Sequence, residues 1–324
     1  MNSIIQDLRY LLKSFASAIS KVFDGNYGTS NQSPIHVSST TVQPYYSHNT
    51  SAANAIIIKR GFFICVLLAL SLFSTHSFAQ QKVYSVANAH AHNDYEHPVP
   101  FYTAYNAGFG SIEADIFLYK DSLVVSHNVL GINPAKTLQA LYLNPLKEVI
   151  RKNKGLAYKD SAKNLLLLID LKTAAEPTLD ALVKLLQQYK TLTDCPTLKI
   201  VITGNQPDVS KLTSYPSYLY FDGNINKTYP AEALTRIALF SDNFRNYAQW
   251  TGEGPLTDST KNVLETAVTK AHALNKPIRF WAAPDVPNAW SQLMKLNVDY
   301  INTDKIPELS EFFKNQSATL HKER

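Results

Sequence analysis

Three carboxylates and two histidines stand inside or directly after short apolar runs of this chain, and their chemistry is complementary. Apolar runs of roughly four to eight residues are typical of buried strands, and polar residues at their ends are how a barrel of parallel strands builds an active-site face. Carboxylates hold hard cations, and a pair of histidines can pass protons. The pattern therefore indicates metal-assisted phosphodiester chemistry. The five residues are Glu113, Asp115, Asp170, His92 and His127.

Glu113 and Asp115 are separated by one residue of a strand-like run. Side chains two positions apart on a strand point to the same side of the sheet. Inside a barrel that side is the interior, where an unpaired charge is costly, so two charges together need a cation. The alternative is a pair of surface acids on an edge strand. The apolar flanks Ile112, Ile116 and Phe117 argue against it.

Asp170 follows four leucines and an isoleucine, so it emerges from a buried strand. It is a natural third oxygen ligand, and the three carboxylates predict one divalent cation, Mg2+ or Ca2+. Lys172 lies two residues further on, on the same face, where its ammonium group can contact a phosphate oxygen of the substrate. The alternative for this pair is an acid at a helix N-terminus and a solvated lysine.

Two histidines near three acids fit the roles of general base and general acid. His127 follows a Val-Val strand, and we assign it one of the two roles. His90 and His97 compete with His92 for the other role. We favour His92 because Asn93 and the residue after it begin a loop, which would place the imidazole at the barrel mouth. We expect Asn93 itself to contact substrate.

Trp281 ends a late strand-like run and could wall the pocket or stack on a substrate head group. Packing of its indole in the core is an equal possibility, and both interpretations stay open. Asp304 closes the final strand-like run. For Asp304 we expect a cap of the following turn rather than a role in the chemistry.

The elements that must position these residues alternate between strands and helices. About eight strand–helix units over about 235 residues match a closed (β/α)8 barrel, the TIM barrel of the α/β class. The expected strands are 83–89, 110–119 with 123–126, 164–171, 199–203, 218–221, 237–240, 278–282 and 298–301. The expected helices are 99–107, 137–152, 179–189, 257–274 and 288–296.

Composition and charge limit the class of protein. The chain has 324 residues, of which 45% are apolar and 18% charged, as expected for a globular protein with a sizeable core. The net charge is only +5 and no basic block stands out, so we expect no nucleic-acid partner. Cys195 would be the single cysteine of the mature chain if Cys65 is removed, and we therefore expect no internal disulfide.

Residues 56–79 have the three parts of a secretory signal. Lys59 and Arg60 precede the apolar stretch 61–73, and small residues lie at positions −3 and −1 of a site after Ala79. The apolar stretch is shorter than the roughly 20 residues of a spanning helix. We therefore expect cleavage near Ala79, a secreted or periplasmic protein, and no stable membrane span after processing. The alternative is an uncleaved membrane anchor.

The segment before this signal is unlike the rest of the chain. Residues 28–55 are rich in Ser, Thr, Asn and Gln and show no apolar periodicity, so they cannot bury enough surface to fold. We interpret residues 1–55 as disordered or as a gene-model extension, with the true start near residues 56–58. The remaining part, residues 83–315, is expected to be a single phosphodiesterase barrel domain.

The order and spacing of five separate motifs resemble the glycerophosphodiester phosphodiesterase family, within the phospholipase C-like phosphodiesterase superfamily. The family has a histidine after the first strand, a Glu-x-Asp strand, a histidine after a Val-Val-type strand, an acid-x-Lys pair, and a late Val-Asp-x-Ile-x-Thr-Asp strand. In this chain they are His92, Glu113–Asp115, His127, Asp170–Lys172 and Val298–Asp304, and the likeness covers about residues 83–310.

The first motif departs from the family pattern. The usual His-Arg-Gly is replaced by His92-Asn93-Asp94, which lacks the arginine that would hold phosphate. The wider stretch His-x-His-Asn-Asp-Tyr instead looks like the branch of altered-inheritance-of-mitochondria protein 6-like proteins. The resemblance implies a metal-dependent phosphoric diester hydrolase that acts on a glycerophosphodiester or on a small-molecule or lipid phosphodiester, and the signal-like segment before Ala79 predicts that it is secreted.

Two other functions remain open at this point. One is a non-catalytic barrel that binds a phosphate or sugar ligand and keeps the acids as a structural cation site. The other is a metal-dependent hydrolase of sugars or amides, which would hold zinc mainly through histidines. Metal content separates the two catalytic readings, since magnesium or calcium favours the phosphodiesterase.

Overall fold

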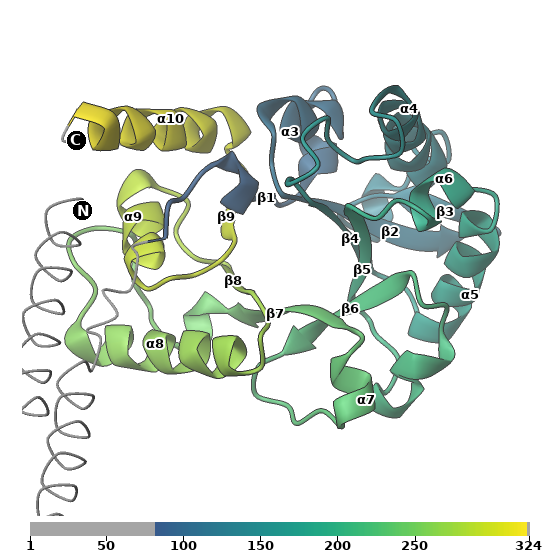
Figure 1. The fold of residues 1–324 in the computed structure, drawn as a ribbon. Helices are drawn as coiled ribbons and strands as arrows, with labels where there is room; N and C mark the ends of the chain where they lie inside the picture. The colour runs from purple at the N-terminus through teal and green to yellow at the C-terminus, as the bar shows by residue number, and fades with distance from the viewer. Residues whose placement is uncertain (1–81, 323–324) are drawn as a thin grey trace, which may run out of the picture. The chain divides into compact units, whose positions relative to one another are not determined.

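Eight parallel strands form a nearly closed barrel, visible as the ring of strands in Figure 1. In chain order the strands are β1 Ala89–Ala91, β2 Ser111–Tyr119, β3 Ser122–Val125, β4 Leu165–Leu171, β5 Leu198–Gly204, β6 Leu219–Asn224, β7 Ile237–Asn243, β8 Ile278–Trp281 and β9 Ile301–Thr303. Neighbours follow the order β8-β7-β6-β5-β4-β2-β1-β9, and β3 pairs antiparallel with β2. A parallel bridge between Arg279 and Tyr300 joins β8 to the segment before β9. The predicted (β/α)8 barrel is confirmed.

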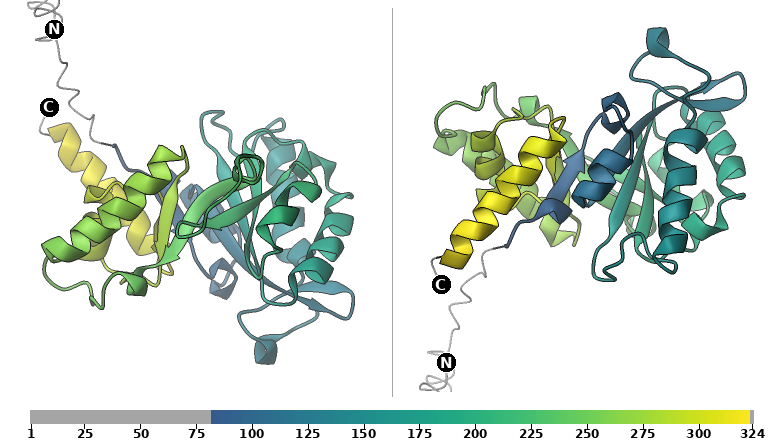
Figure 2. Two further views of the ribbon diagram at one scale, coloured as in Figure 1. Left: turned by 90° about the horizontal axis from the view of Figure 1, so that it is seen from below. Right: turned by 90° about the horizontal axis from the view of Figure 1, so that it is seen from above.

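Helices lie outside the ring of strands, as the two further views in Figure 2 show. They are α3 Tyr102–Ala107, α4 Asn144–Lys152, α5 Ala175–Leu186, α6 Lys190–Thr193, α7 Ala231–Leu234, α8 Asp258–Ala273, α9 Pro287–Lys295 and α10 Ile306–Lys322. Amphipathic helices such as α4 and α5 bury their leucines against the outer face of the barrel. Because helices cover the strands from outside and side chains fill the barrel from inside, β4 is apolar on both faces.

Alternation along the strands separates the two faces and explains the position of the site. Leu166 and Leu168 point to the barrel interior, where they pack with Val201 and Leu239 in a small cluster of their own. The alternate residues of β4 belong to the larger core between the barrel and its helices. Asp170 is two positions beyond Leu168 and therefore also faces inward. The interior is thus apolar at one level and polar at the next.

The first and last strands lie later in the chain than predicted. The run 83–89 does not form one strand, because Ser85 caps a short 3-10 turn, Val86–Asn88, and its hydroxyl accepts a hydrogen bond from the Ala87 amide. The strand β1 starts only at Ala89 and contains His90. The last strand likewise starts at Ile301. Local capping thus overrides the apolar pattern at the first strand.

Two of the predicted helices also differ in their bounds. The segment predicted as one helix over 137–152 begins with a π-helical turn, Gln139–Leu143, before α4. Helix α5 begins at Ala175, four residues before its predicted start. Neither difference changes the barrel, because the strands that flank these helices are where the sequence predicts them.

The hairpin of β2 and β3 returns the chain to the level of the carboxylates. Ile116 pairs with Val125, and the Ser126 amide donates a hydrogen bond to the Asp115 carbonyl at 3.2 Å. His127 is the next residue, so this hairpin brings it beside Asp115. A histidine far from the acids in sequence thereby reaches the edge of the same site.

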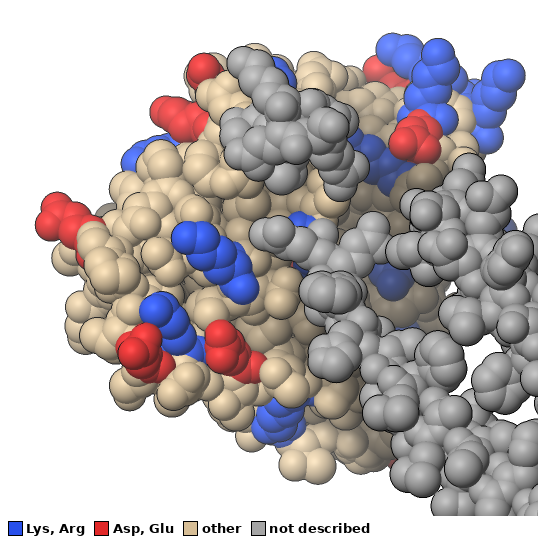
Figure 3. All heavy atoms as spheres, turned by 60° about the vertical axis from the view of Figure 1, so that its left-hand side comes forward, with Lys and Arg blue, Asp and Glu red and all other residues tan. Residues whose placement is uncertain are grey.

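The computed structural model describes residues 82–322, with side chains to residue 316. The segments 1–55 and 56–79, predicted as an extension and a secretory signal, lie outside these residues. Within the described range no helix has the length and apolarity needed to cross a membrane. On the face in Figure 3, basic side chains are interspersed with acidic and neutral ones. The absence of a nucleic-acid partner stays a prediction.

Candidate active site

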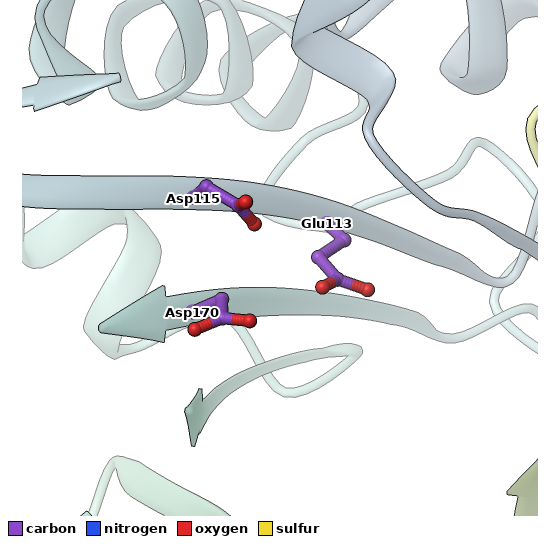
Figure 4. Close-up of side chains that lie close together, drawn as sticks. All are labelled: Glu113, Asp115 and Asp170. Atoms are coloured by element: carbon purple, nitrogen blue, oxygen red, sulfur yellow. The ribbon is translucent and has the colours of Figure 1, made fainter. Parts of the chain in front are cut away.

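The three predicted metal ligands converge at the polar level of the barrel interior. Glu113 and Asp115 come from β2 and Asp170 from β4, and Figure 4 shows them around the space between these strands. Asp115 and Asp170 are register partners across the two strands. One oxygen from each of the three carboxylates lies within 4.8 Å of the others. The strand register therefore creates the cluster that the sequence predicts.

The cluster fits a hard cation, because two of its oxygens have no protein partner. Asp115 Oδ1 and Asp170 Oδ1 are buried and accept no hydrogen bond from the described residues. Burial raises the pKa of Asp115 to about 6 and also raises the pKa of Asp170, so both charges are incompletely compensated. At Gly204 a Cβ atom would lie 1.9 Å from Asp170 Oδ1. Only a glycine there leaves room for this carboxylate.

Lys172 lies among the carboxylates. Its Nζ is 2.8 Å from Asp115 Oδ2 and 3.0 Å from Asp170 Oδ2. Burial alone would lower the pKa of this lysine, but the hydrogen bond to Asp115 and the charge of Asp170 outweigh it and raise the pKa. One ammonium group therefore balances two acids, and Lys172 also lines the cavity. Its contact with a phosphate oxygen stays a prediction.

His92 is held by an acid from the other end of the chain. Its Nδ1 donates to Asp304 Oδ1 at 2.7 Å, which leaves Nε2 for a ligand in the cavity that His92 lines. Burial alone would lower the pKa of His92, but the hydrogen bond to Asp304 and the Glu113 carboxylate raise it. Asp304, for which the sequence predicted a turn cap, is thus the partner of a histidine. The short β1–β9 pairing places the two strand ends side by side.

His90, the competing histidine, is fully buried in the barrel wall. Its Nδ1 is 2.7 Å from Ser111 Oγ, and its Nε2 is 2.6 Å from Glu113 Oε2 and 2.5 Å from Arg279 Nη1. Burial and the Arg279 charge lower its pKa to about 3, so its ring is neutral at ordinary pH. Both ring nitrogens are occupied, and this geometry suits a structural role.

His127 lies at the edge of the carboxylate cluster, with 55% of its side chain exposed. Its Nδ1 is 3.1 Å from the Tyr95 hydroxyl and 3.6 Å from Asp115 Oδ2. The Tyr95 hydroxyl is also 2.8 Å from Asp115 Oδ2 and 2.7 Å from Asn93 Oδ1. Tyr95 therefore connects the two loops that carry His92 and His127. The sequence analysis missed it, although it belongs to the stretch His-Asn-Asp-Tyr.

Asn93 adopts a left-handed backbone conformation with a φ of 49°. Its Nδ2 is 3.0 Å from His92 Nδ1, and its Oδ1 accepts from the Tyr95 hydroxyl. The side chain therefore packs among the residues that support the two histidines. Its predicted contact with substrate stays a prediction.

Arg279 is the most connected residue of the site, and the sequence analysis gave it no role. It is only 3% exposed and donates to Ser241 Oγ at 2.8 Å. Its Nη1 lies 3.0 Å from Glu113 Oε2 and from Asn302 Oδ1. The Arg279 charge outweighs the effect of burial and holds the pKa of Glu113 well below its usual range. The arginine that is missing after β1 thus has a counterpart on β8, two positions before Trp281.

His92, Glu113, Asp170, Lys172 and Arg279 line one cavity of about 1100 Å³ at the barrel mouth, whereas Asp115 and His127 are not among its lining residues. It is lined by His92, Glu113 and Asp170 at one side and by residues of β6 to β8 at the other. Trp281 lines it with 41% of its surface exposed, so its indole is not packed in the core. The arrangement can hold a cation, an anion beside it, and a larger organic group.

Comparisons with known proteins find two matching family models and several similar chains. A model of the AIM6-like phosphodiesterase domain matches residues 79–201, and one of the glycerophosphoryl diester phosphodiesterase family matches residues 277–307. Altered inheritance of mitochondria protein 6 from Kluyveromyces lactis is 27% identical, over 72% of this chain and 73% of its own. A homolog from Arthroderma benhamiae is 25% identical, over 69% and 83%.

Over these residues the chain is similar to the glycerophosphodiester phosphodiesterase-like superfamily, and in particular to its AIM6-like branch. The resemblance predicted from the five motifs is thereby confirmed. Among solved structures, a glycerophosphodiester phosphodiesterase from Parabacteroides distasonis aligns with a TM-score of 0.45 at 15% identity, covering 72% of this chain and 96% of that one. The two family models leave the stretch 202–276, which contains β6 and β7, unmatched.

Proposed function

We propose that this chain is a metal-dependent phosphoric diester hydrolase. The observation that carries the proposal is a cluster of three inward-facing carboxylates, two of which, Glu113 and Asp170, line the same cavity as the paired His92. Glu113, Asp115 and Asp170 would hold one Mg2+ or Ca2+ through their oxygens. A bound divalent cation would neutralise negative charge that builds up on a non-bridging phosphate oxygen.

The chain's own residues supply proton transfer and a second positive contact. His92 presents Nε2, because Nδ1 is engaged with Asp304, and it takes or gives a proton at that atom. His127 serves in the opposite role from the edge of the cluster. Lys172, whose ammonium group lies beside Asp115 and Asp170, would supply the second positive contact to the phosphate. Each positioned acid or base contributes roughly 10²- to 10⁴-fold to the rate.

We also propose that the substrate is a small-molecule or lipid phosphodiester and that the protein is exported. The carboxylate cluster and the size of the cavity support the first statement. The apolar stretch before Ala79 supports the second. N-terminal sequencing of the natural protein tests export, with Gln80 as the expected first residue, and a mature terminus inside residues 2–50 would contradict it.

Phosphorus NMR of the full chain tests the proposed function directly. The protein is incubated with glycerophosphocholine, lysophosphatidylcholine, sphingomyelin and phosphatidylinositol in Mg2+ or Ca2+, with a chelator control. We expect a new phosphorus resonance that the chelator suppresses and that Asp115→Asn abolishes. Asp242→Asn is the matched control, because Asp242 is a buried acid of the same sheet outside the carboxylate cluster. No change with any diester would favour a non-catalytic ligand-binding barrel.

A further inference from the structure

A further buried acid lines the cavity that Glu113 and Asp170 line. Asp222 lies on β6, is 7% exposed and lines the cavity. Its Oδ2 accepts from Thr203 Oγ1 at 3.2 Å, whereas its Oδ1 is buried without a hydrogen-bond partner among the described residues. A buried carboxylate oxygen without a partner is costly. A donor from a bound molecule would remove that cost.

The neighbouring strand provides a contrast. Asp242 on β7 is also buried, but both of its oxygens are satisfied within the protein. Its Oδ1 accepts from the Asn243 amide and from Asn246 Nδ2, and its Oδ2 accepts from Asn226 Nδ2 and the Tyr247 hydroxyl. Asp242 therefore holds the loops around it together. Asp222 keeps one oxygen without a partner among the described residues, and the residue lines the cavity.

Arg279 fixes the distance between this acid and the carboxylate cluster. Its Nη1 is 3.0 Å from Glu113 Oε2, and its Nη2 is 3.6 Å from Asp222 Oδ2. One guanidinium group thus spans the gap between the two acids. A phosphate held at the carboxylate cluster would have its esterified alcohol within reach of Asp222.

The surroundings of Asp222 suit hydroxyl groups better than a cationic head group. They mix hydrogen-bond donors and acceptors, as the hydroxyl groups of a ligand require. The exposed indole of Trp281 offers a flat apolar face for the carbon atoms of a ring. The other polar residues that line this part of the cavity include Asn205, Gln206, Asp208, Asn224, Lys227, Tyr229 and Ser241.

We infer that Asp222 is a specificity-determining residue that binds the hydroxyl groups of a sugar ring esterified to the phosphate. The inference rests on the proposed function, since it names the alcohol part of the same diester. The cavity of about 1100 Å³ exceeds the needs of a three-carbon alcohol and is in the range that holds ligands of drug size. Ring hydroxyls would donate to Asp222 Oδ1 and accept from the amides and Lys227.

Equilibrium binding of phosphate monoesters to the full chain tests this site without requiring turnover. Glucose 1-phosphate, cyclohexyl phosphate and phosphocholine are titrated calorimetrically in Mg2+ into the wild type, Asp222→Asn and Asp242→Asn. Glucose and cyclohexyl phosphates share a six-membered ring and differ in hydroxyls. We expect the wild type and Asp242→Asn to prefer the glucose ester by roughly 10- to 100-fold, the value of a hydrogen bond to a charged group. Asp222→Asn should lose most of that preference and keep its affinity for cyclohexyl phosphate within about threefold.

Three results would overturn the inference. The first is a wild type that binds glucose and cyclohexyl phosphates equally, a result that does not depend on how the variants fold. The second is an equal loss of both esters in Asp222→Asn, which would make Asp222 a positioning residue for Arg279. The third is a preference for phosphocholine. A preference for the glucose ester without hydrolysis of any diester would contradict the proposed function but not the role of Asp222. Hydrolysis of a diester without a preference for the glucose ester would contradict the role of Asp222 but not the proposed function.

Discussion

At each of two sides of the barrel mouth one basic side chain bridges two acids, and the two bridges differ in rigidity. On the β2–β4 side Lys172 joins Asp115 to Asp170, and on the β8 side Arg279 joins Glu113 to Asp222. The lysine is 27% exposed in its side chain and ends in a single flexible ammonium group, while the arginine is 3% exposed and has a planar, five-donor head. The first bridge can therefore yield to an incoming cation or phosphate, and the second is a fixed part of the wall.

This difference indicates that the β2–β4 side carries out the reaction and that the β6–β8 side selects the substrate. The β2–β4 side carries two carboxylate oxygens without partners, as expected where a cation binds. The β6–β8 side carries one such oxygen beside fixed charges, as expected where a neutral polar group binds. Changes on the first side should reduce turnover of every substrate, whereas changes on the second should alter stability and selectivity.

The largest effect is expected from Glu113→Gln. The variant keeps the shape of the side chain and removes the charge, so the cation loses a ligand and kcat/KM should fall at least roughly 10³-fold. Steady-state hydrolysis measures this, and circular dichroism establishes that the fold is retained. Glu176→Gln is the control, because Glu176 is an exposed acid of α5 paired only with Lys211. Activity of Glu113→Gln within threefold of the wild type would overturn the assignment of the metal site.

Asp304→Asn should have a smaller effect of roughly 10- to 100-fold on kcat, because His92 loses its orienting partner but keeps its place. Asp304 raises the pKa of His92, so the limb of the pH–rate profile that belongs to His92 should move to lower pH in the variant. A full pH–rate profile of both proteins measures the shift. A lower kcat with an unmoved limb would mean that Asp304 supports only the fold.

Asp222 should make stability depend on pH. Burial raises its pKa to about 6, so in the window between about pH 7 and pH 4 the folded state binds a proton before the unfolded state does. Stability therefore falls as pH rises through this window, by on the order of 2 kcal/mol. Urea unfolding at several pH values should show the trend in the wild type and a weaker one in Asp222→Asn. If the free energy of unfolding changed equally with pH in both proteins, Asp222 would not be a source of the pH dependence.

The smallest expected effect is the stabilisation of the fold by Mg2+, which should depend on Asp170 and not on Asp222. Mg2+ at ten times its dissociation constant should stabilise the wild type by about 1.4 kcal/mol. Asp170→Asn should lose this increment, and Asp222→Asn should retain it, because Asp222 lies across Arg279 from the cation. Thermal unfolding with and without Mg2+ provides the measurement. If Asp222→Asn also lost the stabilisation by Mg2+, Asp222 would belong to the cation site, and the two sides would form a single site.

Much of the β2–β4 side could be predicted from sequence, because the information is local. The Glu-x-Asp spacing in a strand fixes a common face for Glu113 and Asp115, and four leucines before Asp170 mark a buried strand that ends at an acid. The barrel itself follows from the alternation of strands and helices. Local capping at Ser85 shifted the first strand, and apolar periodicity carries no information about such a turn.

The sequence by itself determined the fold class, the three carboxylates and the presence of histidines beside them. Only the tertiary structure decided which partners each would have. Asp304 is 212 positions from His92, and Arg279 is 166 positions from Glu113. Closure of the barrel brings the first strand beside the last and makes these pairs neighbours. Spacing along a chain specifies a face of one strand, whereas a contact across a barrel depends on the register of all the strands between.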